Sequence, residues 1–118
     1  MTDLDRLIEA VEAGAATDDH FAAVWSPNDL RAWQVNQVAM VAYNGSLDAA
    51  LRLHEALLPG WVVENLGNAV IDGTGGWNVR IVSPDYLETY LHATANAGTP
   101  ARAWLLAILR ALKAKGAA

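Results

Sequence analysis

Apolar side chains recur every three or four residues in three segments of the chain, which is the spacing of an amphipathic helix. The first segment follows Thr2 and stops at Gly14, the second follows Ser46 and stops at Pro59, and the third follows Thr99-Pro100. Thr and Ser favour the N-cap, Pro the first helical position, and Gly the position just past the end. We predict three helices, over residues 3–13, 46–58 and 100–114. Their core stripes contain Leu4, Leu7, Ile8 and Val11, then Leu47, Leu51, His54 and Leu58, then Trp104, Leu105, Ile108, Leu109 and Leu112.

The pattern between residues 15 and 45 is less regular. Thr17 can cap a short helix, and Ser26-Pro27 can begin a third helix that runs towards Asn44-Gly45. Gln34 and Gln37 interrupt the apolar stripe of that third helix. The stretch VNQVAMVAY is therefore also compatible with a β-strand.

Alternation with a period of two predicts strands in the second half of the chain. WVVENL (61–66) and WNVRIV (77–82) are rich in bulky and β-branched residues and flank a turn-rich hairpin. In the second of these strands Trp77, Val79 and Ile81 share one face, and Asn78 and Arg80 share the other. Residues 86–95 also alternate and predict a third strand, with a helix starting at Pro84 as the competing interpretation.

This order of elements predicts one domain over residues 1–118, with N-terminal helices in 1–42 and a helix–strand–strand–strand–helix core in 43–115. Short connections favour an antiparallel sheet of three to four strands. We expect an α+β fold layered as an α-β-α sandwich. The helices 46–58 and 100–114 would cover one face of the sheet, and the N-terminal helices the other face or an edge.

Composition excludes several classes of protein. The 118 residues are 53% hydrophobic and contain no cysteine, which excludes disulfide scaffolds and thiolate metal sites. The N-terminus has no basic region typical of a signal peptide, and no apolar run approaches the ~18–20 residues that span a membrane. We therefore expect a cytoplasmic protein without membrane contacts.

The net charge of −5 is unevenly distributed. Residues 1–30 hold seven acidic side chains and only Arg6, whereas residues 100–118 hold four basic side chains and no acid. Nucleic-acid binding needs a basic face, so the overall acidity argues against direct nucleic-acid contact. The two segments can pair within one chain or between two chains. A homodimer would need an apolar patch, for which Trp25 or Trp33 is the candidate.

Motifs for catalysis or for cofactor and metal binding are missing from the sequence. His20, His54 and His92 have no HExxH or His-x₃-His spacing, so no metal site is predicted. The glycine-rich stretch that begins at Asp72 lacks the Lys-Ser/Thr of a phosphate-binding loop. We expect no enzyme activity and no cofactor.

Two groups of residues are candidates for binding a protein. Tyr, Arg and His together are typical of recognition surfaces, and the polar face of the predicted sheet carries Arg80, Tyr86, Tyr90 and His92. If the N-terminal helices cover that face, these residues form a polar layer inside the fold instead. The second candidate is the acidic pair Asp18 and Asp19, which could meet a basic groove on a partner.

Three segments resemble a known family. MTDLDRLIEAVEAG, VAYNGSLDAALRLHEALLPGW and TPARAWLLAILRAL are similar to the phage ABA-sandwich domain family of small phage and prophage proteins, over residues 1–14 and 43–112. Residues 15–42 depart from it. The resemblance implies a three-layer α-β-α fold and a phage or prophage origin, and no settled activity. The order of elements is also that of double-stranded RNA-binding domains, but only Arg102 stands where those domains carry lysines.

These observations leave four functional hypotheses, of which the last is an enzyme whose site the motifs do not reveal. The first is a non-enzymatic phage or prophage accessory protein that binds a host or phage protein stoichiometrically. A counter-defence inhibitor, such as an anti-CRISPR, is a sharper form of the first. The third is a binder or sponge for a small ligand such as a nucleotide, which would use the polar face of the sheet.

Overall fold

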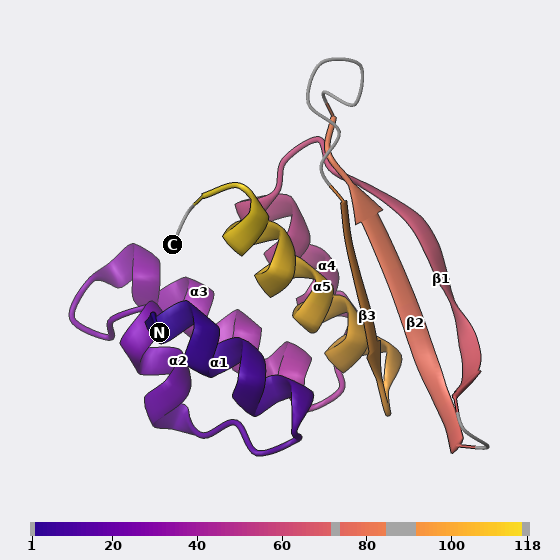
Figure 1. The fold of residues 1–118 in the computed structure, drawn as a ribbon. Helices are drawn as coiled ribbons and strands as arrows, with labels where there is room; N and C mark the ends of the chain where they lie inside the picture. The colour runs from indigo at the N-terminus through magenta and orange to yellow at the C-terminus, as the bar shows by residue number, and fades with distance from the viewer. Residues whose placement is uncertain (1, 72–73, 85–91, 117–118) are drawn as a thin grey trace.

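The computed structural model describes residues 2–71, 74–84 and 92–116 of the chain. This part of the chain forms four helices, then three strands, and then a fifth helix (Figure 1). The elements are α1 (Asp3–Glu12), α2 (Asp18–Val24), α3 (Leu30–Tyr43), α4 (Leu47–Leu57), β1 (Val62–Ile71), β2 (Thr74–Val82), β3 (His92–Ala97) and α5 (Pro100–Ala114). The predicted α+β class is therefore confirmed.

The strands form an antiparallel sheet in the order β1-β2-β3. β1 is longer than predicted and includes residues 67–71, which pair with the first half of β2. A bulge at Glu64 interrupts the pairing between Val63 and Asn65. β3 begins at His92, whereas residues 85–91 of the predicted third strand, and the competing helix from Pro84, lie outside the described residues.

Helix α5 lies at the centre of the fold. Its residues 103–109 are all buried, so the helix is apolar around its whole circumference and needs cover on every side. One side packs on β2 and β3, where Val79, Ile81 and Ala95 are buried. The other sides contact α1, α3 and α4. The small side chain of Ala95 lets the helix approach β3 closely.

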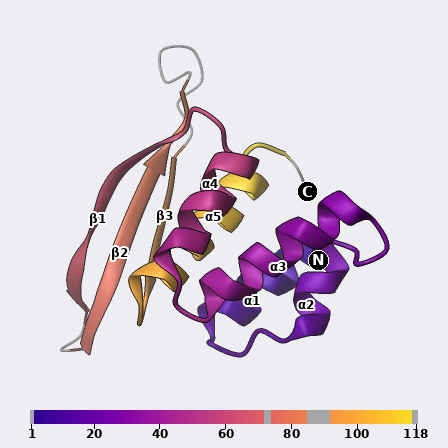
Figure 2. The same ribbon diagram turned by 180° about the vertical axis from the view of Figure 1, so that it is seen from behind.

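The helices lie on one face of the sheet, which corrects the expected α-β-α order of layers. Figures 1 and 2 show the sheet on one side of the molecule, α4 and α5 next to it, and α1, α2 and α3 beyond them. The N-terminal helices pack on other helices because α5 presents an apolar side away from the sheet. The face of the sheet that carries Arg80 is therefore not covered by any described helix.

The third predicted helix is confirmed with a later start than predicted, whereas part of the core assignment on α4 was wrong. The segment VNQVAMVAY is helical, and α3 begins after Asp29, whose carboxylate accepts a hydrogen bond from the Arg31 N–H. Ser26 instead accepts from the Asn28 N–H and forms a local turn before the helix. Leu47 and Leu51 were expected in the core but are 43% and 44% exposed, because α4 turns His54 and not these leucines towards α5.

The predicted caps of the other helices are present. Thr2, Ser46 and Thr99 each accept a hydrogen bond from a backbone N–H in the first turn of their helix. Thr17 is the N-cap residue of α2, and its own N–H donates to His20 Nδ1 at 2.9 Å. Within the described part of the chain, none of the helices has the length and apolar character needed to cross a membrane.

Candidate functional site

The outer face of the sheet carries a cross-linked set of polar side chains. Arg80 Nε donates to Glu64 Oε1 at 3.1 Å, and Asn65 Nδ2 donates to Asn78 Oδ1 at 2.9 Å. The Asn78 amide also donates to the Ala95 carbonyl at 3.4 Å. These contacts join β1 to β2 and β2 to β3, so much of the polarity of this face is used inside the sheet.

The structure tests only part of the predicted sheet site. Tyr86 and Tyr90 lie outside the described residues. The backbone of His92 opens β3 opposite Val82, two pairs away from the pair formed by Thr94 and Arg80. The register therefore brings positions 80 and 92 to the same end of the β2–β3 ladder.

The predicted acidic site does not join the sheet site. Asp18 and Asp19 are exposed in the first turn of α2, in the layer of helices farthest from the sheet (Figure 1). Their carboxylates lie near the positive end of the helix dipole, which is a stabilising position for acids. The two groups of candidate residues thus belong to separate surfaces.

Acidic residues of α1 pair with basic residues of α5 within one chain. Glu12 Oε2 accepts from Arg110 at 3.0 Å, and Asp5 Oδ1 lies 2.6 Å from Lys113 Nζ. The hydrogen bond from Lys113, helped by those from Thr2, lowers the pKa of the Asp5 carboxyl from 3.8 to about 2. The opposite charges of the two ends of the sequence therefore serve, in large part, to hold α1 on α5.

His54 is a buried structural residue and not a free ligand. Trp104 Nε1 donates to His54 Nδ1 at 3.2 Å, and His54 Nε2 lies 2.8 Å from the Trp61 carbonyl oxygen. Because an indole N–H can only donate, Nδ1 accepts and Nε2 carries the proton that is donated to Trp61. Both ring nitrogens are satisfied. Among the described residues, no group of three or more His, Asp or Glu side chains could hold a metal ion.

Tyr43 organises a second, partly buried junction that the sequence did not indicate. The Arg102 guanidinium lies 4.2 Å above the Tyr43 ring and donates to the Tyr43 carbonyl. The Tyr43 hydroxyl accepts from the Ala16 N–H, and its ring meets Phe21 edge to face. Arg102, the residue at the position where RNA-binding domains use lysines, is therefore part of the packing between α3 and α5.

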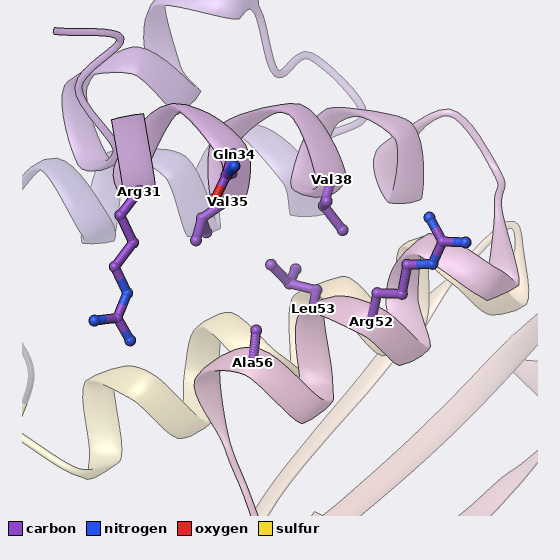
Figure 3. A pocket seen from close by; sticks show the side chains of 7 residues that line it. All are labelled: Arg31, Gln34, Val35, Val38, Arg52, Leu53 and Ala56. Atoms are coloured by element: carbon purple, nitrogen blue, oxygen red, sulfur yellow. The ribbon is translucent and has the colours of Figure 1, made fainter. Parts of the chain in front are cut away.

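A groove with a mainly apolar lining lies between α3 and α4. Figure 3 shows apolar side chains from both helices facing each other across it, with an arginine towards each end. We define the α3–α4 groove by its lining residues, which enclose about 270 Å³: Arg31, Gln34, Val35, Val38, Arg52, Leu53 and Ala56. A smaller hollow of about 140 Å³ shares Val38 and Arg52 and extends to Gln37, Val41 and Ala49.

Helix α3 exposes three large apolar side chains, of which Val41 lines the smaller hollow and Leu30 and Trp33 lie outside the lining of both. Leu30 is 71% exposed, Trp33 43% and Val41 51%. Leu30, Gln34, Gln37 and Val41 follow a spacing of three or four residues, so they share one side of α3. Apolar side chains clustered on one helix mark an interaction surface more strongly than the same side chains scattered singly.

The arginines at this groove differ from the other four in the protein. Arg6, Arg80, Arg102 and Arg110 each bind a carboxylate or a carbonyl of the same chain. Within the described residues, the guanidinium groups of Arg31 and Arg52 make no assigned hydrogen bond or ion pair. The groove therefore combines an apolar floor with two available cations.

Sequence reasoning missed the groove because its residues come from two helices. One signal was present: apolar residues lie on every side of the third predicted helix, and Gln34 and Gln37 break its stripe. Such a pattern indicates either burial on all sides or an apolar surface left for a partner. The tertiary structure shows that α3 packs at the outside of the fold, which favours an apolar surface left for a partner.

No family model matches the chain, and neither the curated proteins nor the solved structures contain a significant match to it. The resemblance to the phage ABA-sandwich domain family remains a prediction.

Proposed function

We propose that this protein is a non-enzymatic phage or prophage accessory protein that binds a host or phage protein stoichiometrically in the cytoplasm. The observation that carries the proposal is the exposure of three large apolar side chains on α3, Leu30, Trp33 and Val41, of which Val41 lines the hollow that adjoins the α3–α4 groove. Exposing such side chains to water is unfavourable, and a protein partner would bury them. Trp is among the residues that most often dominate binding energy at interfaces.

A counter-defence role is a narrower form of this proposal. It would use Asp18 and Asp19 to meet a basic groove that normally holds nucleic acid. The pairing of Asp5 and Glu12 with α5 reduces the acidic charge that is free for such mimicry. We therefore propose the general binding function and treat counter-defence as one identity that the partner can have.

The experiment is affinity capture from host lysate, followed by reconstitution from purified components. Wild-type protein is compared with the double variant Leu30→Gln/Trp33→Gln and with Val41→Gln. Val62→Gln is the matched control, because Val62 is 56% exposed on β1 and is far from α3 in the sequence. We expect 1:1 binding by calorimetry, roughly tenfold or more weaker for the α3 variants and unchanged for Val62→Gln.

Two results would overturn the proposal. One is the absence of any protein that binds the purified wild type at a defined stoichiometry. The other is a nucleotide or other small molecule that co-purifies with the protein in native mass spectrometry, which would favour a ligand binder. The neighbourhood of the gene gives an independent check: structural phage genes favour an assembly role, and a regulator beside a cluster of small genes favours counter-defence.

A further inference from the structure

We infer that the occupant of the α3–α4 groove is an acidic amphipathic helix of the partner protein, with carboxylates about two turns apart on its apolar side. This inference rests on the proposed protein-binding function and names the chemistry of the partner. Three features of the groove support it: its apolar floor, its two arginines, and the position of these arginines towards opposite ends of the groove.

The floor of the groove suits the apolar face of a helix. Val35 and Val38 come from α3, and Leu53 and Ala56 come from α4, so the hollow runs between two helices (Figure 3). Amphipathic helices bind grooves of this kind through apolar anchors spaced three or four residues apart. A third helix in the groove would also bury part of Val41, which lines the adjoining hollow.

The charge of the groove selects an acidic partner. Arg31 and Arg52 flank an apolar surface, and their guanidinium groups have no assigned partner among the described residues. Guanidinium groups bind carboxylates in a two-pronged geometry that adds specificity to the attraction. This local basic character stands out in a protein whose net charge is −5.

The spacing of the arginines sets the spacing of the carboxylates. Arg31 lies at one end of the groove, and Arg52 faces Val38 near the other end (Figure 3). Val38 is seven residues after Arg31 in α3, which corresponds to about 10 Å along the helix axis. A bound helix that runs beside α3 therefore places carboxylates at positions i and i+7, with apolar residues at i+3 and i+4 between them.

A second copy of this chain does not supply such a helix from its described residues. Helix α4 has Asp48 and Glu55 seven residues apart, but it forms one wall of the groove and carries Arg52 between the two acids. The other acidic amphipathic helix among the described residues is α1, which buries Leu4, Leu7 and Val11 against its own fold. Asp5 and Glu12 of that helix already pair with α5. The occupant is therefore a segment of a different protein.

The test uses designed peptides and the whole protein. The probe is a helical peptide of roughly 15 residues with Glu at i and i+7 and Leu at i+3 and i+4. Control peptides carry Lys in place of both Glu residues, or keep the same composition with the two Glu residues on the opposite face. Binding is measured by fluorescence anisotropy of the labelled peptide at two salt concentrations.

We expect the Glu peptide to bind wild-type protein roughly tenfold or more tightly than either control peptide, and more weakly at high salt. The variant Arg31→Glu/Arg52→Glu should lose the Glu peptide and gain the Lys peptide. Arg31→Lys/Arg52→Lys keeps the charge but loses the two-pronged geometry, so it should bind the Glu peptide with an affinity between those of wild type and the charge-reversed variant. Arg6→Gln, on α1, is the matched control. Circular dichroism of each variant establishes that it is folded.

Equal binding of the Glu and Lys peptides, or an unchanged affinity of the charge-reversed variant, would overturn the inference. The two proposals can be told apart with the reconstituted partner of the preceding section. If that partner binds wild type and Arg31→Glu/Arg52→Glu equally, the protein-binding function stands and the acidic-helix inference is wrong. If no partner binds at a defined stoichiometry, the function itself is wrong.

Discussion

Trp104 and His54 show how single residues couple two helices in the core. Their side chains lie edge to face, and one hydrogen bond joins them while a second ties His54 to the Trp61 carbonyl. Both residues are almost fully buried, so every polar atom in this group needs a partner inside the protein. The group therefore fixes α4, α5 and the start of β1 relative to one another.

We predict that Trp104→Ala lowers the free energy of unfolding by ~3–5 kcal/mol, because it leaves a cavity and removes the donor to His54. Trp104→Phe keeps the aromatic ring and should cost ~1–3 kcal/mol, mainly from the unsatisfied His54 nitrogen. Trp33→Ala is the matched control on the exposed side of α3, with a loss below ~1 kcal/mol. Urea unfolding measures all three, and a small loss for Trp104→Ala would mean that this packing is wrong.

At the scale of elements, α1 is attached to α5 by charge as well as by its apolar stripe. The Asp5–Lys113 and Glu12–Arg110 pairs lie along the contact between the two helices. Asp5 also accepts from the Thr2 N–H in the capping box of α1. One carboxylate thus stabilises both the start of a helix and its attachment to the core.

The lowered pKa of Asp5 predicts how this attachment depends on pH. The folded-state pKa of about 2 lies below the ordinary value of 3.8, so the ionised form is favoured in the folded protein. Its stabilising contribution is therefore complete above about pH 5 and is lost as the pH falls from about 4 through 2. We expect Asp5→Asn to be less stable than wild type at pH 6, with a difference that shrinks over that range.

Urea unfolding of wild type and Asp5→Asn at a series of pH values measures this effect. Lys113→Met should reduce the stability at pH 6 and remove most of the additional effect of Asp5→Asn, since the pair acts as a unit. Asp3→Asn is the control, because Asp3 pairs only with the exposed Arg6 of its own helix. Equal stability of Asp5→Asn and wild type at pH 6 would contradict the prediction.

At the scale of the whole molecule, the charges of the two ends of the sequence are joined within one chain. A dimer is therefore not needed to pair them. In a twofold dimer formed through the α3–α4 groove, the arginines of one copy would lie opposite the arginines of the other. A homodimer formed through Trp25 or Trp33 would have to depend on exposed apolar side chains alone. Like charges facing each other disfavour such an association.

We predict that the protein is a monomer at high micromolar concentration. Static light scattering or analytical ultracentrifugation of the wild type measures the mass, to be compared with 12.6 kDa for one chain. Trp33→Gln serves as the control, because it should leave the mass unchanged. A dimeric wild type that becomes monomeric in Trp33→Gln would show that a second copy occupies the surface assigned here to another protein.

Local signals in the sequence determined most of the elements. The caps at Thr2, Ser46 and Thr99 and the apolar spacing behind them located three helices, because caps and stripes act within one or two turns. Alternation likewise located the buried face of β2, where Val79 and Ile81 lie. For α3 the same rules were ambiguous, since Ser26-Pro27 and Asp29 are both acceptable starts of a helix.

The tertiary structure decided which surface each element turns to the solvent. The sequence shows an apolar core stripe on α5, but not that residues 103–109 would all be buried, nor that the helices would gather on one face of the sheet and leave Arg80 on the other. The α3–α4 groove exists only because α3 packs against α4, which brings Arg31 and Arg52 to one hollow from positions 21 residues apart. Periodicity reports what a segment can bury, whereas the neighbour that buries it depends on contacts between residues far apart in the chain.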